Sequence, residues 1–260
     1  MLGEILHCVQ DDKIIKIIMI DTETKMHQIE ALKMDFSRPM PEEYEKIIAG
    51  SSFIRDSEPY SKNFMYVWGR PPREGSSVED FIKQLQDEDT DDDNEPDLFK
   101  KRRLFLKELI KDKKFIDLGS GDPSRSVAAP ALAKVCNAEE YIGIDLGSTP
   151  EQSSDISIEV DKDGFRFSKI QADMLMAVTK YKKEGGNIFF LSGIESHPAN
   201  LTNNEYTTTL IKEMSRLCKT GDAILSVGSD VEYFGVILEQ NGFKEDMSVD
   251  LMNGRVFIKQ

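Results

Sequence analysis

A short apolar run that ends in a glycine turn constrains the fold of this chain more than any other feature of its sequence. Residues 115–118 (FIDL) are β-compatible, and two glycines in 119–123 (GSGDP) allow a sharp turn and a close approach of the backbone to a ligand. An alanine-rich helix is predicted over 126–135, with its free N–H groups directed at that turn. A second strand over 141–145 (YIGID) ends in Asp145. This order predicts a doubly wound α/β sheet with a nucleotide-sized site at the carboxyl ends of its strands.

The residues after the turn exclude two common phosphate-binding loops. A dinucleotide fingerprint needs a third glycine, but Asp122, Pro123 and Ser124 follow the second one here. The lysine of a P-loop is also absent. An acidic side chain beside the turn disfavours a pyrophosphate and suits a cation. Asp145, at the end of the second strand, is placed to accept hydrogen bonds from a ribose diol.

The acid-x-Gly-x-Gly pattern of residues 117–121 resembles the first motif of the class I S-adenosylmethionine-dependent methyltransferases. The segments that follow continue the resemblance over roughly residues 99–260. Further strands are expected over 167–172, 187–191 and 223–227, with helices over 98–111, 203–219 and 231–240. A terminal hairpin is expected over 243–249 and 255–259. The resemblance therefore implies a doubly wound seven-stranded sheet with an antiparallel C-terminal hairpin.

The same resemblance implies how the cofactor, S-adenosyl-L-methionine, is held. Asp145, with Leu146 beside it, would bind the ribose hydroxyls, and Asp173 the adenine amino group, with Met174 against the ring. The glycine turn would hold the methionine portion through Gly119, Ser120 and Gly121. Asp117 either orients the turn or bonds the ammonium of the ligand through water. Asp145 could instead be a surface acid at a strand end, and Asp117 could instead be a cap on the glycine turn. Asp173 could likewise have a structural role alone.

The strand over 187–191 is followed by Ser192 and Gly193, which should border the transferring methyl group. Beyond them, His197 has a pKa range suited to taking a proton from the acceptor, and Glu195 could hold an amine or orient the histidine. A lone histidine before a proline is often only a local hydrogen-bonding residue, and many methyltransferases need no general base. Arg102 or Arg103 could reach the cofactor carboxylate or could face solvent.

Three functions fit this pattern. The first is methyl transfer to a small-molecule or protein acceptor. The second is an aminopropyltransferase-like reaction on the same fold. Those enzymes resemble one another in an aspartate just after the fourth parallel strand, and the presence of Ser192-Gly193 at that place argues against this reaction. The third is a catalytically silent, cofactor-binding scaffold. We take the first as the prediction, with the acceptor undefined.

The chain divides near an acidic run at 87–97 (DEDTDDDNEPD), which we expect to be a solvated linker or loop. Residues 98–260 form the expected methyltransferase domain, and residues 1–86 an N-terminal α+β extension. In that extension, strands are expected at 4–9, 13–20, 25–30 and 63–68, and a helix at 42–49 opened by Pro41. Substrate recognition, a lid and homodimer formation remain open as its role.

Composition limits the partners and the location of the protein. A net charge of -14 over 260 residues disfavours nucleic acid, because nucleic-acid binders present a basic surface to phosphate. Cys136 and Cys218 fall on expected helices, and we expect both to be buried, reduced thiols. The three histidines are scattered along the sequence and do not predict a metal site. The first residues lack a secretion signal and no segment has membrane-spanning length, so we expect a cytoplasmic protein.

Overall fold

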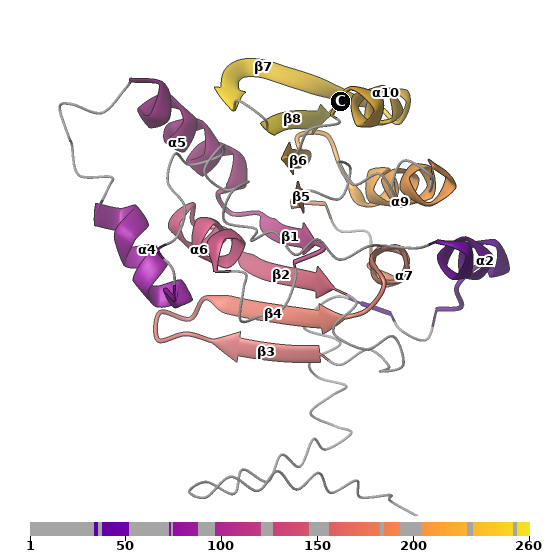
Figure 1. The fold of residues 1–260 in the computed structure, drawn as a ribbon, viewed down its shortest axis with the longest axis horizontal. Helices are drawn as coiled ribbons and strands as arrows, with labels where there is room; N and C mark the ends of the chain where they lie inside the picture. Colours follow the sequence, from indigo (N-terminus) through magenta and orange to yellow (C-terminus); the bar gives the residue numbers. More distant parts are fainter. Residues whose placement is uncertain are drawn as a thin grey trace, which may run out of the picture.

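The computed structural model describes most of the second half of the chain and several shorter stretches of the first. The described residues are 34–35, 38–51, 73, 75–87, 97–120, 127–145, 156–182, 185–192, 204–227, 231–251 and 254–260. They build one eight-stranded sheet with helices packed on both of its faces (Figure 1). In the described part of the chain, no helix has the length and apolar composition needed to cross a membrane.

Five parallel strands form the centre of the sheet, in the order β4-β2-β1-β5-β6. Their bounds are Lys114–Leu118 (β1), Glu140–Asp145 (β2), Arg166–Gln171 (β4), Asn187–Ser192 (β5) and Ala223–Val227 (β6). All five residues of β1 and of β6 are buried, which explains why both strands are mostly apolar rather than alternating. Because the five strands are parallel, their carboxyl ends meet at one edge of the sheet.

Antiparallel strands complete both edges of the sheet. On one side, β3 (Ile156–Val160) pairs with β4. On the other, β8 (Gly254–Lys259) pairs with β6, and β7 (Phe243–Leu251) pairs with β8 as the last strand. The predicted α/β sheet with an antiparallel C-terminal hairpin is therefore confirmed. The sheet has eight strands rather than the expected seven, because β3 was not predicted.

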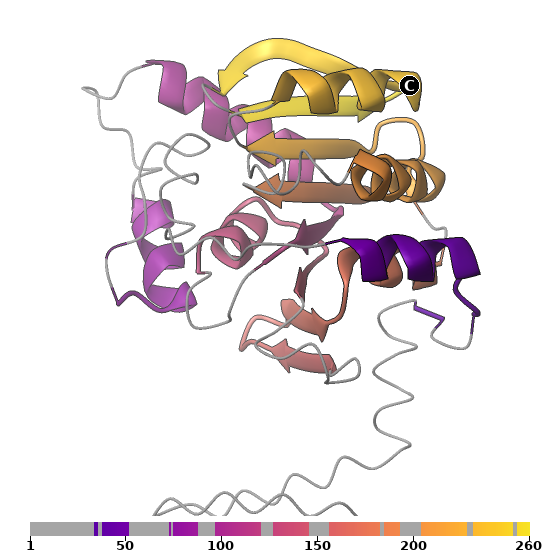
Figure 2. The same ribbon diagram turned by 45° about the vertical axis from the view of Figure 1, so that its right-hand side comes forward.

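Helices cover both faces of the sheet (Figures 1 and 2). A hydrophobic core lies between the sheet and the helices on each face. On one face lie α4 (Val78–Asp87), α5 (Asp97–Ile110) and α6 (Ala128–Val135). The other face carries α2 (Glu42–Gly50), α7 (Met174–Lys180), α9 (Asn204–Leu217) and α10 (Val231–Gln240). Successive side chains of β1 point to opposite faces of the sheet: Phe115 lies in the core with α4, α5 and α6, and Ile116 lies in the core with α2, α7, α9 and α10.

The described parts of the N-terminal extension pack directly on the sheet domain. The predicted helix at 42–49 is confirmed as α2, which follows Pro41 and packs against α7 and α9. An unpredicted helix, α4, packs against α6 on the opposite face, and its last residue is Asp87 of the acidic run. Asp97, the last residue of that run, begins α5. Residues 88–96 and the expected strands at 4–9, 13–20, 25–30 and 63–68 lie outside the described residues.

Candidate functional site

The glycine turn begins where β1 ends and is bonded to the neighbouring strand β2. Gly119 has a φ of +78°, a left-handed conformation that glycine adopts without the steric penalty of a Cβ atom. Its N–H and that of Ser120 both donate to the carbonyl oxygen of Ile144, at 2.8 and 3.1 Å. The turn therefore folds against the residue immediately before Asp145.

Asp145 occupies the last position of β2, is partly exposed, and lies between the glycine turn and the end of β4. Its carbonyl oxygen accepts a hydrogen bond from the N–H of Ala172 at 2.9 Å, just beyond β4. Backbone hydrogen bonds thus link the ends of β1, β2 and β4, where the sequence predicted the cofactor residues. The structure brings Gly119, Ser120, Asp145 and Asp173 to the same edge of the sheet.

Asp117 lies inside β1, fully buried, on the face that packs against α6. The hydroxyl of Tyr141 on β2 donates a hydrogen bond to Asp117 Oδ2 at 2.8 Å. Tyr141 is itself buried, so each polar group provides the other with a partner that water would otherwise supply. This contact gives Asp117 a structural role within the sheet, and its role toward the turn or the ligand stays a prediction.

Asp173 serves as the N-cap of α7, because its Oδ1 accepts the N–H of Met176 at 3.1 Å. The hydroxyl of Tyr206 on α9 approaches both carboxylate oxygens, at 3.1 and 3.0 Å. Burial raises the pKa of Asp173, while the hydrogen bonds from Met176 and Tyr206 act in the opposite direction. A structural role for Asp173 is thus evident, and its contact with adenine stays a prediction.

Sequence reasoning missed Tyr141 and Tyr206, the two partners of these carboxylates. A signal for both was present, because each tyrosine occupies a position facing the core and a buried hydroxyl needs a hydrogen-bond partner. Tyr206 also accepts the N–H of Leu175 at 3.2 Å and so joins α9 to the start of α7. Met174, the first residue of α7, is buried as well.

The residues predicted to border the acceptor are described only in part. Ser192 is the last residue of β5, beside β1 in the sheet and therefore at the same edge as Asp145. Outside the described residues lie five predicted site residues: Gly121, Leu146, Gly193, Glu195 and His197. Their roles stay predictions.

Both arginines of the helix before β1 are buried, so the solvent-facing alternative for Arg102 and Arg103 is wrong. Arg102 Nε donates to the backbone carbonyl of Asp250 on β7, and its guanidinium lies 5.3 Å from the centre of the Phe99 ring. The physical reason is that α5 packs against β7, which encloses this face of the helix. Arg102 accordingly joins α5 to the terminal hairpin.

Among the residues that the structure describes, no three His, Cys, Asp or Glu side chains come close enough together to hold a metal ion. The chemistry offered by the described site consists of carboxylates and backbone groups at the ends of parallel strands.

The sheet order now identifies the architecture. Parallel strands β4-β2-β1-β5-β6, followed by the antiparallel pair β8-β7, reproduce the seven-stranded sheet with a terminal hairpin that the dinucleotide-binding fold lacks. The fold is that of the class I S-adenosylmethionine-dependent methyltransferases. Strand β3 is an addition at one edge.

Solved structures with related folds carry methyltransferase names. The N-methyltransferase NodS from Bradyrhizobium japonicum is 15% identical, with 65% of this chain and 98% of that one covered and a TM-score of 0.38. A TehB-like SAM-dependent methyltransferase from Corynebacterium glutamicum is 13% identical, covering 70% and 98% with a TM-score of 0.36. An O-methyltransferase family protein from Burkholderia thailandensis is 11% identical, covering 83% and 66% with a TM-score of 0.41.

No family model matches the sequence, and no curated protein matches it. The fold is therefore identified by the strand order and pairing of this chain itself.

Proposed function

We propose that this protein is an S-adenosylmethionine-dependent methyltransferase that acts on a small-molecule or protein acceptor. The observation that carries the proposal is the linked set of strand ends, in which the glycine turn is hydrogen-bonded to β2 directly before Asp145. This arrangement puts a left-handed glycine and a partly exposed carboxylate side by side at the carboxyl edge of a parallel sheet.

The described residues fit S-adenosylmethionine in their chemistry. Asp145 offers carboxylate oxygens to the two hydroxyls of a ribose, and the turn at Gly119 offers backbone with no Cβ atom in the way. Asp173 and Met174 would border the adenine, and residues 119–121 the methionine portion. When bound, this cofactor supplies a methyl group on a positively charged sulfur, a good leaving system.

The protein contributes alignment and exclusion of water rather than bond polarisation. Residues 192–193 follow β5 and, on this proposal, border the acceptor atom. His197 would take the proton of an oxygen or nitrogen acceptor, and Glu195 would orient that histidine or hold an amine. The net charge of -14 favours small-molecule or protein acceptors over nucleic acid.

Calorimetric titration with S-adenosylmethionine and S-adenosylhomocysteine tests the proposal. We expect saturable binding of both by the wild-type protein and its loss in Asp145→Ala. Glu159→Ala, which removes an exposed carboxylate from the edge strand β3, is the matched control and should bind normally. Folded wild-type protein that binds neither ligand would contradict the proposal. Binding without turnover on any acceptor would favour a silent scaffold instead.

A further inference from the structure

A buried polar group lies directly beneath the glycine turn, between the sheet and α6. It consists of Asp117 on β1, Tyr141 on β2 and Ser120 in the turn. Asp117 is paired in register with Gly143, and Tyr141 precedes Gly143 by two residues on the same face of β2. The tyrosine side chain thus reaches along its own strand, past the glycine, to the carboxylate of the neighbouring strand.

The position of the tyrosine ring is fixed by apolar packing. Tyr141 is 1% exposed, and its ring stacks with that of Phe115 at a centroid distance of 6.3 Å. A phenol held in this way cannot turn its hydroxyl toward water, so the bond to Asp117 Oδ2 is its compensation for burial. The same bond holds the Asp117 side chain in one orientation.

Gly143 provides the space in which this group assembles. A Cβ atom at this position would lie 2.9 Å from the Tyr141 hydroxyl oxygen and 3.0 Å from Ser120 Oγ. The first distance is shorter than Cβ contacts allow and the second is tighter than most of them, so any larger residue would displace the tyrosine hydroxyl and crowd the Ser120 side chain. The requirement for glycine here is steric and differs from the left-handed conformation at Gly119.

We propose that Tyr141 is a positioning residue: by holding Asp117, it fixes the start of the glycine turn, Gly119 and Ser120, in the conformation that binds the amino-acid portion of the cofactor. The inference rests on the proposed function, because it concerns the same site. Three observations carry it: the Tyr141–Asp117 hydrogen bond, the close approach of Tyr141 and Ser120 to the same side of Gly143, and the pair of bonds from Gly119 and Ser120 to Ile144. Tyr141 does not touch the cofactor and acts through Asp117.

Two ligands separate this role from a general effect on stability. S-adenosylhomocysteine contains the amino-acid portion, whereas 5′-methylthioadenosine retains adenine and ribose but lacks it. For Tyr141→Phe, which keeps the ring, we expect the Kd for S-adenosylhomocysteine to rise about tenfold, and that for 5′-methylthioadenosine to change by less than about twofold. Tyr44→Phe, which removes a tyrosine–carboxylate bond on the far face of the sheet, should leave both values unchanged.

A double variant tests whether the tyrosine acts through Asp117. If it does, Tyr141→Phe in an Asp117→Asn background should weaken S-adenosylhomocysteine binding much less than it does in the wild type. Independent, additive losses would overturn the inference, as would an equal loss for both ligands or no loss for either. Wild-type protein that binds 5′-methylthioadenosine and S-adenosylhomocysteine equally well would also overturn it while leaving the cofactor site intact. Failure of the wild type to bind S-adenosylhomocysteine at all would overturn both the inference and the proposed function.

Discussion

At the scale of single residues, the strongest constraint on the site comes from positions where few side chains satisfy the local geometry. Gly119 has a positive φ and closes the turn against Ile144. Asp173 combines a helix cap with a hydrogen bond from a tyrosine of another helix, and it does so while buried. Each can be tested without reference to activity, because each has a defined effect on folding.

Gly119→Ala should destabilise the protein, because a Cβ atom in the left-handed region costs about 1–2 kcal/mol. Gly50 is the matched control: it ends α2 with ordinary helical geometry, and a Cβ atom there would meet nothing within 4 Å. Gly50→Ala should therefore be neutral or stabilising by about 0.5–1 kcal/mol. Urea denaturation of the two variants measures the difference in the free energy of unfolding. Equal effects of the two substitutions would contradict the assignment of strain to Gly119.

The buried Asp173 gives a pH dependence of defined sign. Its pKa is raised from 3.8 mainly by burial, so the folded protein retains a proton that the unfolded chain has already released. Wild-type stability should therefore fall as the pH rises from 3.8 through the higher folded pKa. Asp173→Asn, which can still cap α7, should make the free energy of unfolding decrease less over this pH range.

Asp80 provides a control of opposite sign for this experiment. Hydrogen bonds from the Ser77 hydroxyl and N–H lower the pKa of Asp80 below 3.8. Its contribution to the free energy of unfolding is therefore present above pH 3.8 and is lost as the pH falls through the lower, folded-state pKa. Urea denaturation at a series of pH values compares Asp173→Asn and Asp80→Asn with the wild type. If both variants changed the pH slope in the same direction, the cause assigned to Asp173 would be wrong.

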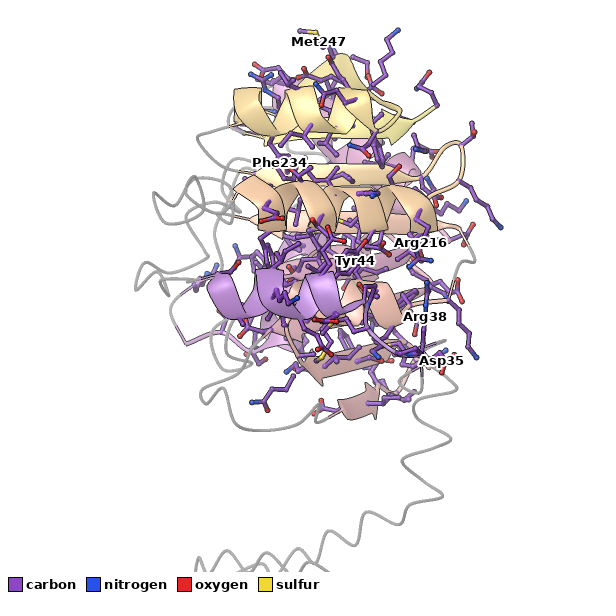
Figure 3. All side chains as sticks on the ribbon, turned by 90° about the vertical axis from the view of Figure 1, so that its right-hand side faces the viewer. Asp35, Arg38, Tyr44, Arg216, Phe234 and Met247 are labelled. Carbon is purple, nitrogen blue, oxygen red and sulfur yellow. The ribbon has the colours of Figure 1, made fainter. Side chains whose placement is uncertain are left out.

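At the scale of elements, α2 shows that part of the N-terminal extension belongs to the folded core. Before α2, Met34 forms an antiparallel bridge with Tyr181, and the N–H of Asp35 donates to the carbonyl of Lys180 at 2.8 Å. Within α2, the Tyr44 hydroxyl donates to Glu213 Oε1 on α9 at 2.9 Å, and Figure 3 shows Tyr44 directed toward that helix. The segment is thus joined to α7 at one end and to α9 along its length.

Ile47→Ala tests that attachment. Ile47 is the buried residue of α2 in the core that includes α7 and α9, so its truncation should cost about 2–4 kcal/mol. The neighbouring Ile48 is only partly buried, and Ile48→Ala should cost clearly less. Both variants should unfold in a single transition, observed by circular dichroism. A second, earlier transition in Ile47→Ala would mean that α2 unfolds independently of the sheet.

Features that depend on neighbouring residues could be predicted from the sequence, whereas contacts between residues far apart in the sequence could not. The buried runs of β1, β5 and β6 and their glycine stops are local signals, and those strands were predicted within a residue or two. The short helix α7 was missed because Asp173 was interpreted as a ligand for adenine, although an acid before MLMAVTK is also a helix-cap signal. Each tyrosine could be predicted to need a hydrogen-bond partner, but the identity of that partner could not, because Tyr141–Asp117 and Tyr206–Asp173 join residues 24 and 33 positions apart.

At the scale of the whole molecule, two buried thiols lie in the two separate cores. Cys136 follows α6 in the core that includes α4 and α5, and Cys218 follows α9 in the core that includes α2 and α10. Both are free and buried, as the sequence predicted. Burial raises the pKa of Cys218 to about 12, so at neutral pH it is held as the unreactive thiol.

The reactivity of these thiols therefore reports whether the two layers open together. With Cys8→Ser as background, Cys136→Ser and Cys218→Ser each leave one thiol to react with a disulfide reagent under native conditions. Because both cores share the strands of one sheet, we expect both thiols to react at similarly slow rates, which rise together with urea as the molecule unfolds globally. A Cys218 that reacts much faster than Cys136 would show that the layer of α2, α7 and α9 opens by itself. The carboxyl edge of the sheet, where we propose that the cofactor binds, would then join one stable and one labile layer of helices. Binding of S-adenosylhomocysteine should in that case slow the reaction of Cys218 selectively.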